Sequence, residues 1–502
     1  MKLYFSILIL FVLNSVSFGA NGTKSLSMGG VGAASVEDTL AQCLNPSVYG
    51  FMNREISNDE NKNVDNNSLA DNIFGWSLVD FELGINLLGD FDRYLDNMAE
   101  IDFDGIVDLD NKSAVSDLSN LAASFEGAVA EGNGLMFSSE VRSSFRIGAF
   151  GFGVEAASQL AVWIDRLDLT NLGLDVSGTN GINSAIQNII QSDSNYSPTG
   201  ELESFTEEMS AELNSAGLNQ NTIQYIDYQI SALINSGDIS SDDIGGAVDN
   251  LVKVIDATNS GQNSFTNNLT SLTARGFIST EVPISLGYAI NDKLSLGATL
   301  SPMKGKVFGT KIWVFSDADY EDSIFDDNYL EKESSALGID IGALYRIPNF
   351  HFALVGKNLN KPTFEGISGQ VSVNGENTEV SIPEVEISPQ VTFSTAYIPS
   401  KRFLIEGSID FLDQKTAHTD YDLRRVSLGS EFDFQFLVLR LGLNKNLASI
   451  NNDLIASAGV GFNFFGCRFD TALAYSLGSK IGFSDNEMPS ELRLGLAASL
   501  DF

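Results

Sequence analysis

The chain has 502 residues, 43% of them hydrophobic, and a mean hydropathy of +0.03. Its 66 acidic and 29 basic residues give a formal charge of -37, which disfavours nucleic-acid binding because phosphate binding depends on clusters of Lys and Arg. After the N-terminus no uninterrupted apolar run approaches the roughly 20 residues that a membrane helix needs, so a helical membrane protein is excluded.

The N-terminus has the plan of a secretory signal. Lys2 precedes an apolar segment over 3–13, and small residues follow around 17–20. This apolar segment is too short to span a membrane, and no Cys lies near the cleavage site to accept a lipid. We therefore predict a signal peptide over residues 1–19 and an exported protein without an anchor.

A glycine-rich segment follows the signal and ends in an Asn-Pro reversal. Glycine permits tight turns and close backbone approach. The run is not a nucleotide-binding loop, because no strand precedes it and no Gly-Lys-Ser/Thr follows. We predict that residues 20–71 form a compact plug packed in a confined space. Its characteristic residues are Met28, Gly29, Gly30, Gly32, Asn45 and Pro46.

These residues also carry a family resemblance. The order Ser27 to Ala34, then Glu37-Asp38, then Asn45-Pro46-Ser47 resembles the N-terminal segment of the long-chain fatty-acid transporter superfamily of outer-membrane barrels. Four later stretches resemble the conjugal-transfer TraF-type barrel proteins more specifically, and they lie at 74–78, 294–304, 355–359 and 428–432. The resemblance covers most of the mature chain. It departs from the pattern at Ser47, where Ala is usual, and in an unusually long segment after residue 167.

Segments with a two-residue hydrophobic period recur beyond residue 70, and we count about 14 of them. The last, 492–502, has apolar side chains at every even position and small, polar or charged ones between. Side chains of a strand alternate between its two faces, so one face suits lipid and the other suits water. The strand has about 11 residues, the length that crosses a bilayer when tilted. We predict an all-β fold: a transmembrane antiparallel barrel over residues 72–502.

A soluble β-sandwich would show the same alternation along its strands. The connections distinguish the two folds. Tight turns at 291–292, 348–349, 399–400 and 465–466 alternate with longer, polar connections. Outer-membrane barrels have short periplasmic turns and longer external loops. This alternation of short and long connections favours the barrel. It also predicts that the last strand runs from the outside to the periplasm and that the long connections lie outside the cell.

Two of the long connections contain helical periodicity. Apolar residues have helical spacing from Val115 to Val129, and again in three segments between Ile182 and Ile255. We predict external helical loops at about 89–133 and 167–277. The second is rich in Ser, Asn and Asp, and we expect a small helical cap or a mobile loop.

Charged residues recur on the face of the strands that we assign to the lumen. Both signs are present, and charges in a low-dielectric interior must pair or stay hydrated. They could form a lattice of ion pairs that holds the plug, or a polar path for a solute. The predicted lumen-facing residues are Asp340, Arg346, Glu406, Asp410, Glu431, Arg440, Arg468, Asp470, Arg493 and Asp501.

Only two cysteines are present, so at most one disulfide can form. Cys43 belongs to the predicted plug and Cys467 follows a predicted periplasmic turn. We hypothesise that they form a bridge that fixes the plug in the oxidising envelope.

We find no support for catalysis or for a cofactor. His351 lies at a predicted turn, and His418 lies in a predicted external loop beside Asp420 and Asp422. A catalytic pair would need a second acidic pair and a positioned water. The acidic run over 317–327 lacks the spaced ligands and the central Gly of a calcium loop, so we interpret it as a solvated face and predict no metal site.

The superfamily resemblance implies passive uptake of a hydrophobic or amphipathic compound through a plugged barrel in a Gram-negative type of outer membrane. The TraF-type resemblance implies an alternative, a structural or envelope-assembly role in conjugation or secretion. We expect outer-membrane lipid and the barrel assembly machinery as partners, the latter through the strand that ends in Phe502. A hydrophobic small molecule would be the further partner in the first case, and envelope proteins in the second.

Overall fold

The computed structural model covers the whole chain, and part of it is described below. The described residues are 22–52, 74–89, 91, 101–109, 111–129, 132–174, 181–261, 264, 267–313, 330–373, 376–448, 453–478, 480–483 and 486–501. The predicted signal peptide therefore lies outside them, as do the second half of the predicted plug and the acidic run over 317–327.

The described part of the chain forms a closed antiparallel barrel. The main sheet has 15 strands, but β4 and β5 are two halves of one strand, because both pair with β3 and with β6 on either side of Val282-Pro283. This leaves fourteen wall strands, as predicted. The ring closes where β1 pairs with the last strand, β23, and where β2 pairs with β3.

The wall strands follow one another around the ring nearly in chain order. They are β1 (Phe74–Leu88), β2 (Gly134–Ile147), β3 (Phe150–Arg166), β4 (Ser271–Glu281) with β5 (Ile284–Ala289), β6 (Leu294–Trp313), β7 (Leu330–Ile347), β8 (Phe350–Lys357), β13 (Gln390–Ser400), β14 (Phe403–Asp410), β17 (Arg425–Asp433), β18 (Leu437–Asn446), β19 (Leu454–Phe464), β20 (Cys467–Ser476) and β23 (Glu491–Asp501).

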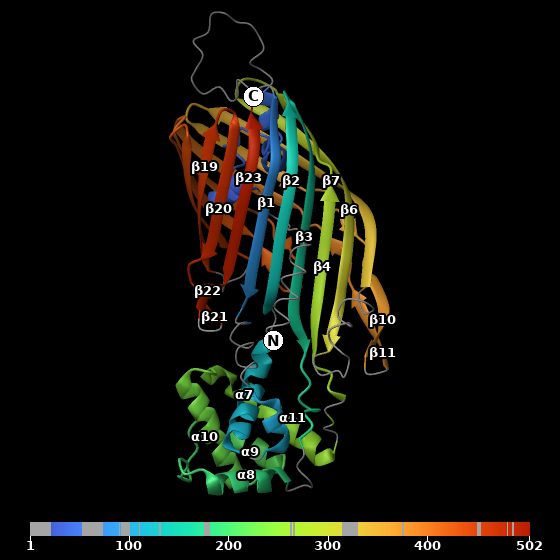
Figure 1. Ribbon diagram of the computed structural model, residues 1–502, viewed down its shortest axis with the longest axis vertical. Coiled ribbons are helices and arrows are strands. Elements are labelled where there is room, and N and C mark those ends of the chain that lie inside the picture. Colours follow the sequence, from blue (N-terminus) through green and yellow to red (C-terminus); the bar gives the residue numbers. More distant parts are fainter. Residues whose placement is uncertain are drawn as a thin grey trace, which may run out of the picture.

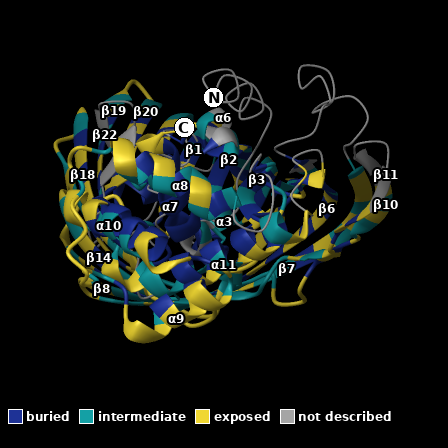
Figure 2. Cartoon of the chain, turned by 90° about the horizontal axis from the view of Figure 1, so that it is seen from below, coloured by how far each residue is buried: buried dark blue, intermediate teal, exposed yellow. Residues whose placement is uncertain are grey.

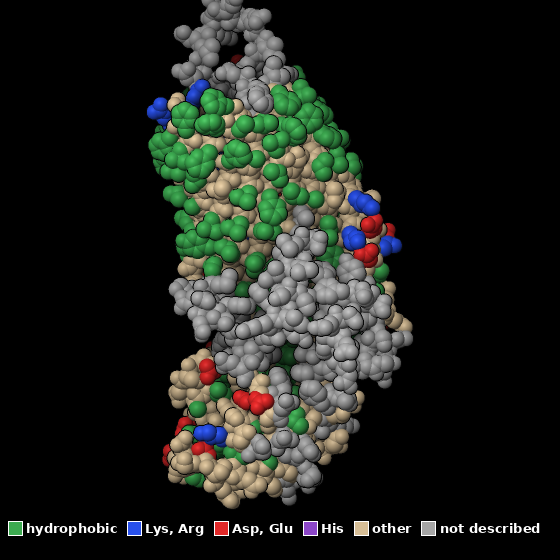
Figure 3. Space-filling model, in the orientation of Figure 1, with side chains coloured by type: hydrophobic (Ala, Val, Ile, Leu, Met, Phe, Trp, Pro, Cys, Tyr) green, Lys and Arg blue, Asp and Glu red, His purple; other side chains and the backbone are tan. Residues whose placement is uncertain are grey.

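The two faces of the wall differ as the sequence predicted. In β23, Leu494 and Leu496 are 49% and 57% exposed on the outside, whereas Arg493, the residue before Leu494, faces inward and is 8% exposed. Hydrophobic side chains form a broad band over the outer surface (Figure 3). Exposed aromatic residues follow the band near the tight turns, as in the girdles of outer-membrane barrels. They include Trp76, Phe150, Tyr288, Phe350, Tyr397 and Phe464.

Tight turns and long connections lie at opposite ends of the barrel (Figure 1). The turns predicted at 291–292, 348–349 and 465–466 are observed, and the one predicted at 399–400 falls two residues later, between β13 and β14. Tight turns and long connections therefore alternate along the described chain, as predicted. We call the end with the tight turns the turn end and the other the loop end.

The plug consists of three short helices inside the ring: α2 (Thr23–Ser27), α3 (Ala41–Leu44) and α4 (Val48–Met52). Its dark-blue ribbon lies behind the front strands in the half of the barrel near the turn end (Figure 1). Nearly all of its described residues are buried. The helices are too short to be stable alone, so their conformation depends on the wall.

A helical cap extends beyond the loop end (Figures 1 and 2). The loop between β1 and β2 supplies α6 (Phe103–Asp108) and α7 (Lys112–Ala128). The loop between β3 and β4 supplies α8 (Gly181–Ser192), α9 (Glu207–Ser215), α10 (Gln220–Ser236), η2 (Ser241–Asp243) and α11 (Ile244–Ser260). One hydrophobic core joins the two loops. Among the described helices, none is long and apolar enough to span a membrane.

The second helical loop is shorter than we predicted. We expected it to continue to residue 277, but β4 begins at Ser271. Polar residues of this strand, such as Thr273 and Arg275, hid its alternation. Short strands complete the other long loops. They are β9 (Thr363–Phe364), β10 (Ile367–Val373), β11 (Glu376–Ile382), β12 (Val385–Glu386), β15 (Gln414–Lys415), β16 (Asp422–Leu423), β21 (Lys480–Phe483) and β22 (Asn486–Pro489).

Candidate functional site: the plug and the polar lumen

The glycine-rich turn of the plug surrounds a buried carboxylate from the wall. Glu406 of β14 accepts hydrogen bonds from the backbone N–H groups of Gly32, at 3.1 Å, and Ala34, at 3.0 Å. Gly29 and Gly30 have φ angles of 75° and 95°, which residues with a side chain rarely adopt. The glycines thus bend the plug backbone into a nest for an anion, and the wall supplies the anion.

Wall glycines let the plug approach the strands closely. A methyl group at Gly442 of β18 would collide with the backbone of Met28 and Gly29, and one at Gly297 of β6 would collide with Pro46. On each of these strands the absence of a side chain is therefore what admits the plug. The predicted plug residues Met28, Gly29 and Pro46 all lie directly against the wall.

Asn45 fixes the point at which the plug segment reverses its chain direction. Its amide nitrogen donates to the carbonyl of Ala33, at 2.9 Å, and its amide oxygen accepts from the N–H of Ser47, at 3.1 Å. The carbonyl of Ser47 in turn accepts from the hydroxyl of Ser295 in β6, at 2.6 Å. The reversal is therefore fixed both to the glycine-rich turn and to the wall.

A third attachment holds the start of α2. The N–H and the hydroxyl of Thr23 both donate to Asp80 of β1, at 3.0 and 2.6 Å. Both residues are buried. Hydrogen bonds to a charged acceptor are among the stronger ones in proteins, so this contact anchors α2 to the first strand.

Several predicted lumen charges form one network near the turn end. Arg440 contacts Glu431 at 2.6 Å and Asp470 at 2.7 Å, and Arg468 contacts the other oxygen of Asp470 at 2.8 Å. Lys24 of α2 approaches Glu431 at 3.8 Å. Every charge has an opposite partner, as a buried network requires.

The remaining predicted lumen residues are spread along the wall. Asp340 accepts from the N–H of Asn358, and Asp410 accepts from the hydroxyl of Thr392. The guanidinium of Arg346 lies 3.5 Å above the ring of Phe51 in α4. The side chain of Asp501 lies outside the described residues. The structure thus brings together Glu431, Arg440, Arg468 and Asp470 near the turn end. Asp340, Arg346 and Asp410 make separate contacts elsewhere on the wall.

Sequence reasoning missed several charged residues that contact the plug or line the lumen. They include Lys24, Asp80, Glu82, Arg425 and Glu491. Asp80 and Glu82 stand at alternate positions of β1, the same pattern that revealed Arg468 and Asp470. Nothing in the sequence distinguishes Lys24 from an exposed lysine.

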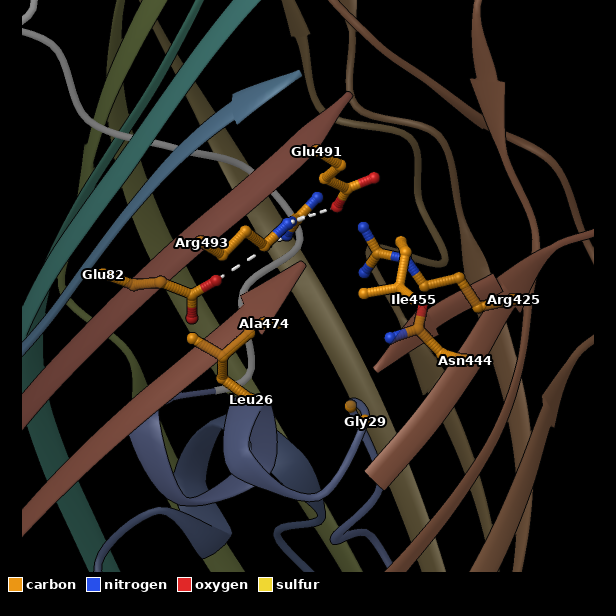
Figure 4. Close-up of a pocket in the computed structure, with 10 residues that line it drawn as sticks. Leu26, Gly29, Glu82, Arg425, Asn444, Ile455, Ala474, Glu491 and Arg493 are labelled. Carbon is orange, nitrogen blue, oxygen red and sulfur yellow. Dashed lines mark hydrogen bonds and ion pairs between the residues drawn. The ribbon is translucent and has the colours of Figure 1, made fainter. Parts of the chain in front are cut away.

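A small cavity lies between α2 and the wall (Figure 4); its empty space of about 370 Å³ includes open solvent, and the centre of a water molecule can reach about 30 Å³ of it. One part of its lining is apolar, from Leu26, Ile455 and Ala474. The other part is charged: Arg493 pairs with Glu491 at 2.7 Å and with Glu82 at 3.6 Å. Most of the wall residues that line this cavity lie in the loop-end halves of their strands. The cavity therefore lies on the side of the plug that faces the loop end. We call it the outer cavity.

A second small cavity, whose empty space of about 300 Å³ includes open solvent, lies on the opposite side of the glycine-rich turn. Its lining includes Gly32, Leu44, Lys357 and Thr392. Both cavities therefore border the plug segment that Glu406 holds.

Comparison with known proteins identifies the family. A family described as "F plasmid transfer operon, TraF, protein" matches residues 132–410, more than half of the chain. The chain belongs to this TraF family. No curated protein matches it.

Solved structures with a similar outline are barrels with a low sequence identity to this TraF-family chain. The Ralstonia pickettii toluene transporter TbuX is 12% identical, with a TM-score of 0.45, over 98% of this chain and 100% of that one. The Pseudomonas putida toluene transporter TodX is 10% identical, with a TM-score of 0.46, over 96% and 98%. A Pseudomonas aeruginosa FadL homologue is 10% identical, with a TM-score of 0.45, over 96% and 98%.

The hypothesised disulfide of this TraF-family chain is wrong, because both cysteines are free. The thiol of Cys43 lies 3.5 Å from Glu155 of β3, and burial raises its pKa. Cys467 stands next to Arg468, whose side chain points inward. Since side chains of a strand alternate, the thiol of Cys467 points away from the plug.

The two histidines serve structure in the described region. The Nδ1 atom of His351 lies 3.1 Å from the carbonyl of Ala34 in the plug. His418 packs in the loop between β14 and β17, where its Nε2 atom lies 3.0 Å from the carbonyl of Asn133. Among the described residues no group of three or more His, Cys, Asp or Glu side chains could hold a metal ion.

Proposed function

We propose that this TraF-family barrel is an outer-membrane channel whose plug controls the passage of a small amphipathic compound. The observation that carries the proposal is the outer cavity, where Leu26 and Ile455 offer an apolar surface opposite Arg493 and Glu491. A purely apolar solute would remove water from this charged group of side chains without replacing it, whereas an amphipathic one places a polar group there and its apolar part against Leu26 and Ile455.

Passage requires the plug to move. The glycine-rich turn and the Asn45 reversal are held by buried hydrogen bonds and by close backbone contact, so they form the fixed part. Helix α2 borders the outer cavity through Leu26, and the side chains of Thr23 and Lys24 attach it to charged residues of the wall. We propose that α2 is the moving part and that it shifts away from β20 and β23.

A reversible cross-link between α2 and β23 tests this mechanism. A Cβ atom at Gly495 would lie 3.0 Å from the hydroxyl oxygen of Thr23, about the distance that separates a Cβ atom from the far sulfur of a disulfide. The variant carries Thr23→Cys and Gly495→Cys, with Cys43→Ser and Cys467→Ser to remove the native thiols. Uptake of a fluorescent alkyl sulfonate, which does not cross bilayers by itself, is measured in proteoliposomes.

We expect little uptake by the oxidised variant and recovery after reduction. Each single-cysteine variant is a matched control, because it carries the same substitution but cannot form the bridge. Equal uptake before and after reduction would mean that α2 does not gate the channel. No uptake by the unmodified chain would contradict the transport function itself.

A second candidate function is envelope assembly in conjugation or secretion. It is favoured by the cap, which has its own hydrophobic core and whose loop segments 101–129 and 168–270 contain 6 and 14 acidic residues against one Lys each. Such a surface suits a basic protein partner. If this function holds, deletion of 168–270 should lower conjugal transfer while the oxidised cross-link leaves it unchanged.

Localisation follows from the same proposal. We propose that residues 1–19 direct export and that the closing strand β23 engages the barrel assembly machinery of a Gram-negative type of outer membrane. Replacement of Phe502 by Ala should then lower the amount of folded barrel in outer-membrane fractions, and a normal amount would contradict this role.

A further inference from the structure

The loop between β14 and β17 crosses the whole width of the barrel at the loop end. In the ring of fourteen strands, β3 is six strands from β14 and seven from β17, so it lies opposite both. Yet this loop, residues 411–424, contacts β3 and the start of β2. It can reach them only by passing through the lumen. We call this segment the strap.

The tip of the strap is fixed to the opposite wall. The N–H of Ala417 donates to Gln159 of β3, at 2.8 Å, and the Nε2 atom of His418 lies 3.0 Å from the carbonyl of Asn133. The imidazole also packs against Trp163, with ring centroids 5.0 Å apart. Gly134 makes room for it, since a Cβ atom there would lie 3.0 Å from the imidazole.

The body of the strap is a small hairpin that keeps its shape. Strands β15 and β16 pair, Lys415 contacts Asp422 at 2.8 Å, and the hydroxyl of Thr416 donates to the carbonyl of Tyr421 at 2.7 Å. Tyr421 and Leu423 pack on Leu88 and Met136 of the first two strands. The hairpin can therefore swing as one unit about its two ends once its tip is released and its body leaves this apolar contact and the hydrogen bonds from Asn86 and Asn446.

The strap lies next to the outer cavity. Arg425 and Glu491 line this cavity, and both interact electrostatically with Tyr421 of the strap. Arg425 is the second residue after Leu423, and its N–H donates to Asp410 at the other end of the strap. The outer cavity thus borders α2 directly, and the strap adjoins two residues of the cavity lining, Arg425 and Glu491.

We propose that the strap is an outer gate of the channel, and that His418 is the positioning residue that latches it to Asn133. The inference rests on the proposed function, because a gate has a role only if a compound enters the outer cavity. The chain then carries two gates in series, the strap toward the outside and α2 toward the periplasm, with the cavity between them.

The latch requires a neutral imidazole. Nδ1 accepts from the N–H of Asp420, at 3.2 Å, so the proton of the neutral ring is on Nε2, which donates to Asn133. Burial lowers the pKa of His418, against the opposing effects of Asn133 and the Asp420 carboxylate. Asp420 is the ionisable group beside it on the strap, while Gln159, Trp163 and Asn133 face it from the wall without charge.

The sign of the pH effect follows from this lowered pKa. The latch is fully formed above the ordinary pKa of histidine, about 6.5, and it weakens as the pH falls below that value, because the charged imidazolium is disfavoured at this buried site and favoured in the released, hydrated strap. Acidification should therefore open the strap.

A reporter thiol in the outer cavity tests the gate without any transport assay. Ala474 lines the cavity and is 1% exposed. The chain with Ala474→Cys, Cys43→Ser and Cys467→Ser is expressed in intact cells and labelled from outside with a sulfonated maleimide too large for porins. Rates are divided by those of a control with Ser197→Cys, an exposed position of the cap, at the same pH.

We expect slow labelling at about pH 7.5, and labelling about tenfold faster after His418→Ala or at about pH 5. His418→Gln should restore slow labelling at both pH values, because its amide can donate to Asn133 but does not titrate. Unchanged labelling after His418→Ala would overturn the gate, and so would fast labelling of the parent at about pH 7.5. A changed labelling rate together with absent uptake would uphold the strap while contradicting the transport function.

Discussion

The plug and the cap are both helical, but they are held together in different ways. The plug helices have five, four and five residues and are fixed by wall residues such as Glu406 and Gly442. The cap contains three helices of 17 residues among its elements and packs them around its own apolar core. In Figure 2 the cap helices show buried residues facing one another and exposed ones facing outward.

This difference determines which of the two regions can be altered without changing the barrel. The plug has a conformation only where the barrel supplies the partners for its backbone. The cap meets its own hydrogen-bonding and packing requirements, as when the amide of Asn250 in α11 donates to the carbonyl of Ala122 in α7, at 2.9 Å. We therefore expect the cap to unfold separately from the barrel and the plug to follow the barrel.

The largest effect should come from a void in the core of the cap. Leu213 of α9 is fully buried, and Leu213→Ala should cost the cap about 2 to 5 kcal/mol while the barrel keeps its stability. Thermal loss of the helical circular dichroism signal measures the cap, and heat-modifiable migration on gels measures the barrel. Glu212→Ala on the same helix is exposed and serves as the control. A joint shift of both transitions would show that the two regions are not independent.

The next effect should come from the lipid-facing side of the closing strand. Leu496→Arg places a charge in the apolar band and should cost the barrel about 2 to 4 kcal/mol. Because the plug depends on the wall, protease should then cut the plug more readily, whereas the melting of the cap stays unchanged. Ser499→Asn on the inward face is the matched control. Equal loss of folded barrel in both variants would contradict the assignment of the faces.

A smaller effect should follow from filling the seat of the plug. Gly442→Val collides with the backbone of Met28 and Gly29 and should destabilise the plugged state by about 1 to 3 kcal/mol. The expected result is a higher conductance in planar bilayers with an intact cap. Gly407→Ala is the control, since a Cβ atom there would approach only the carbonyl of Ser427, at 3.8 Å. Unchanged conductance in Gly442→Val would mean that the plug tolerates displacement.

The smallest effect should come from removing the charge that the plug turn surrounds. Glu406→Gln keeps an oxygen acceptor for Gly32 and Ala34 but removes its charge, so we expect a cost of about 1 kcal/mol. Hydrogen exchange of these two amides should accelerate, while amides in α10 of the cap exchange as before. Slower exchange at the two amides would contradict the role of Glu406 as their acceptor.

Much of this molecule is determined by patterns that the sequence displays by itself. The two-residue period fixes which side chains face lipid, since neighbouring side chains of a strand must point in opposite directions. The same rule could have excluded the bridge between Cys43 and Cys467, because Arg468 and Asp470 face the lumen and Cys467 must then face away. The amphipathic periods also located α7, α8, α10 and α11 of the cap, whereas α6 and α9 were not predicted.

Which inward side chains contact which distant segments depends on the tertiary structure alone. Glu406 binds the N–H groups of Gly32 and Ala34, which precede it by 374 and 372 residues, and His418 reaches Asn133 from the opposite strands of the ring. No local pattern specifies such pairs, because they arise only when the wall closes and brings distant segments to one point. The sequence shows the two faces of each strand, whereas the closed ring selects the partner of each inward side chain.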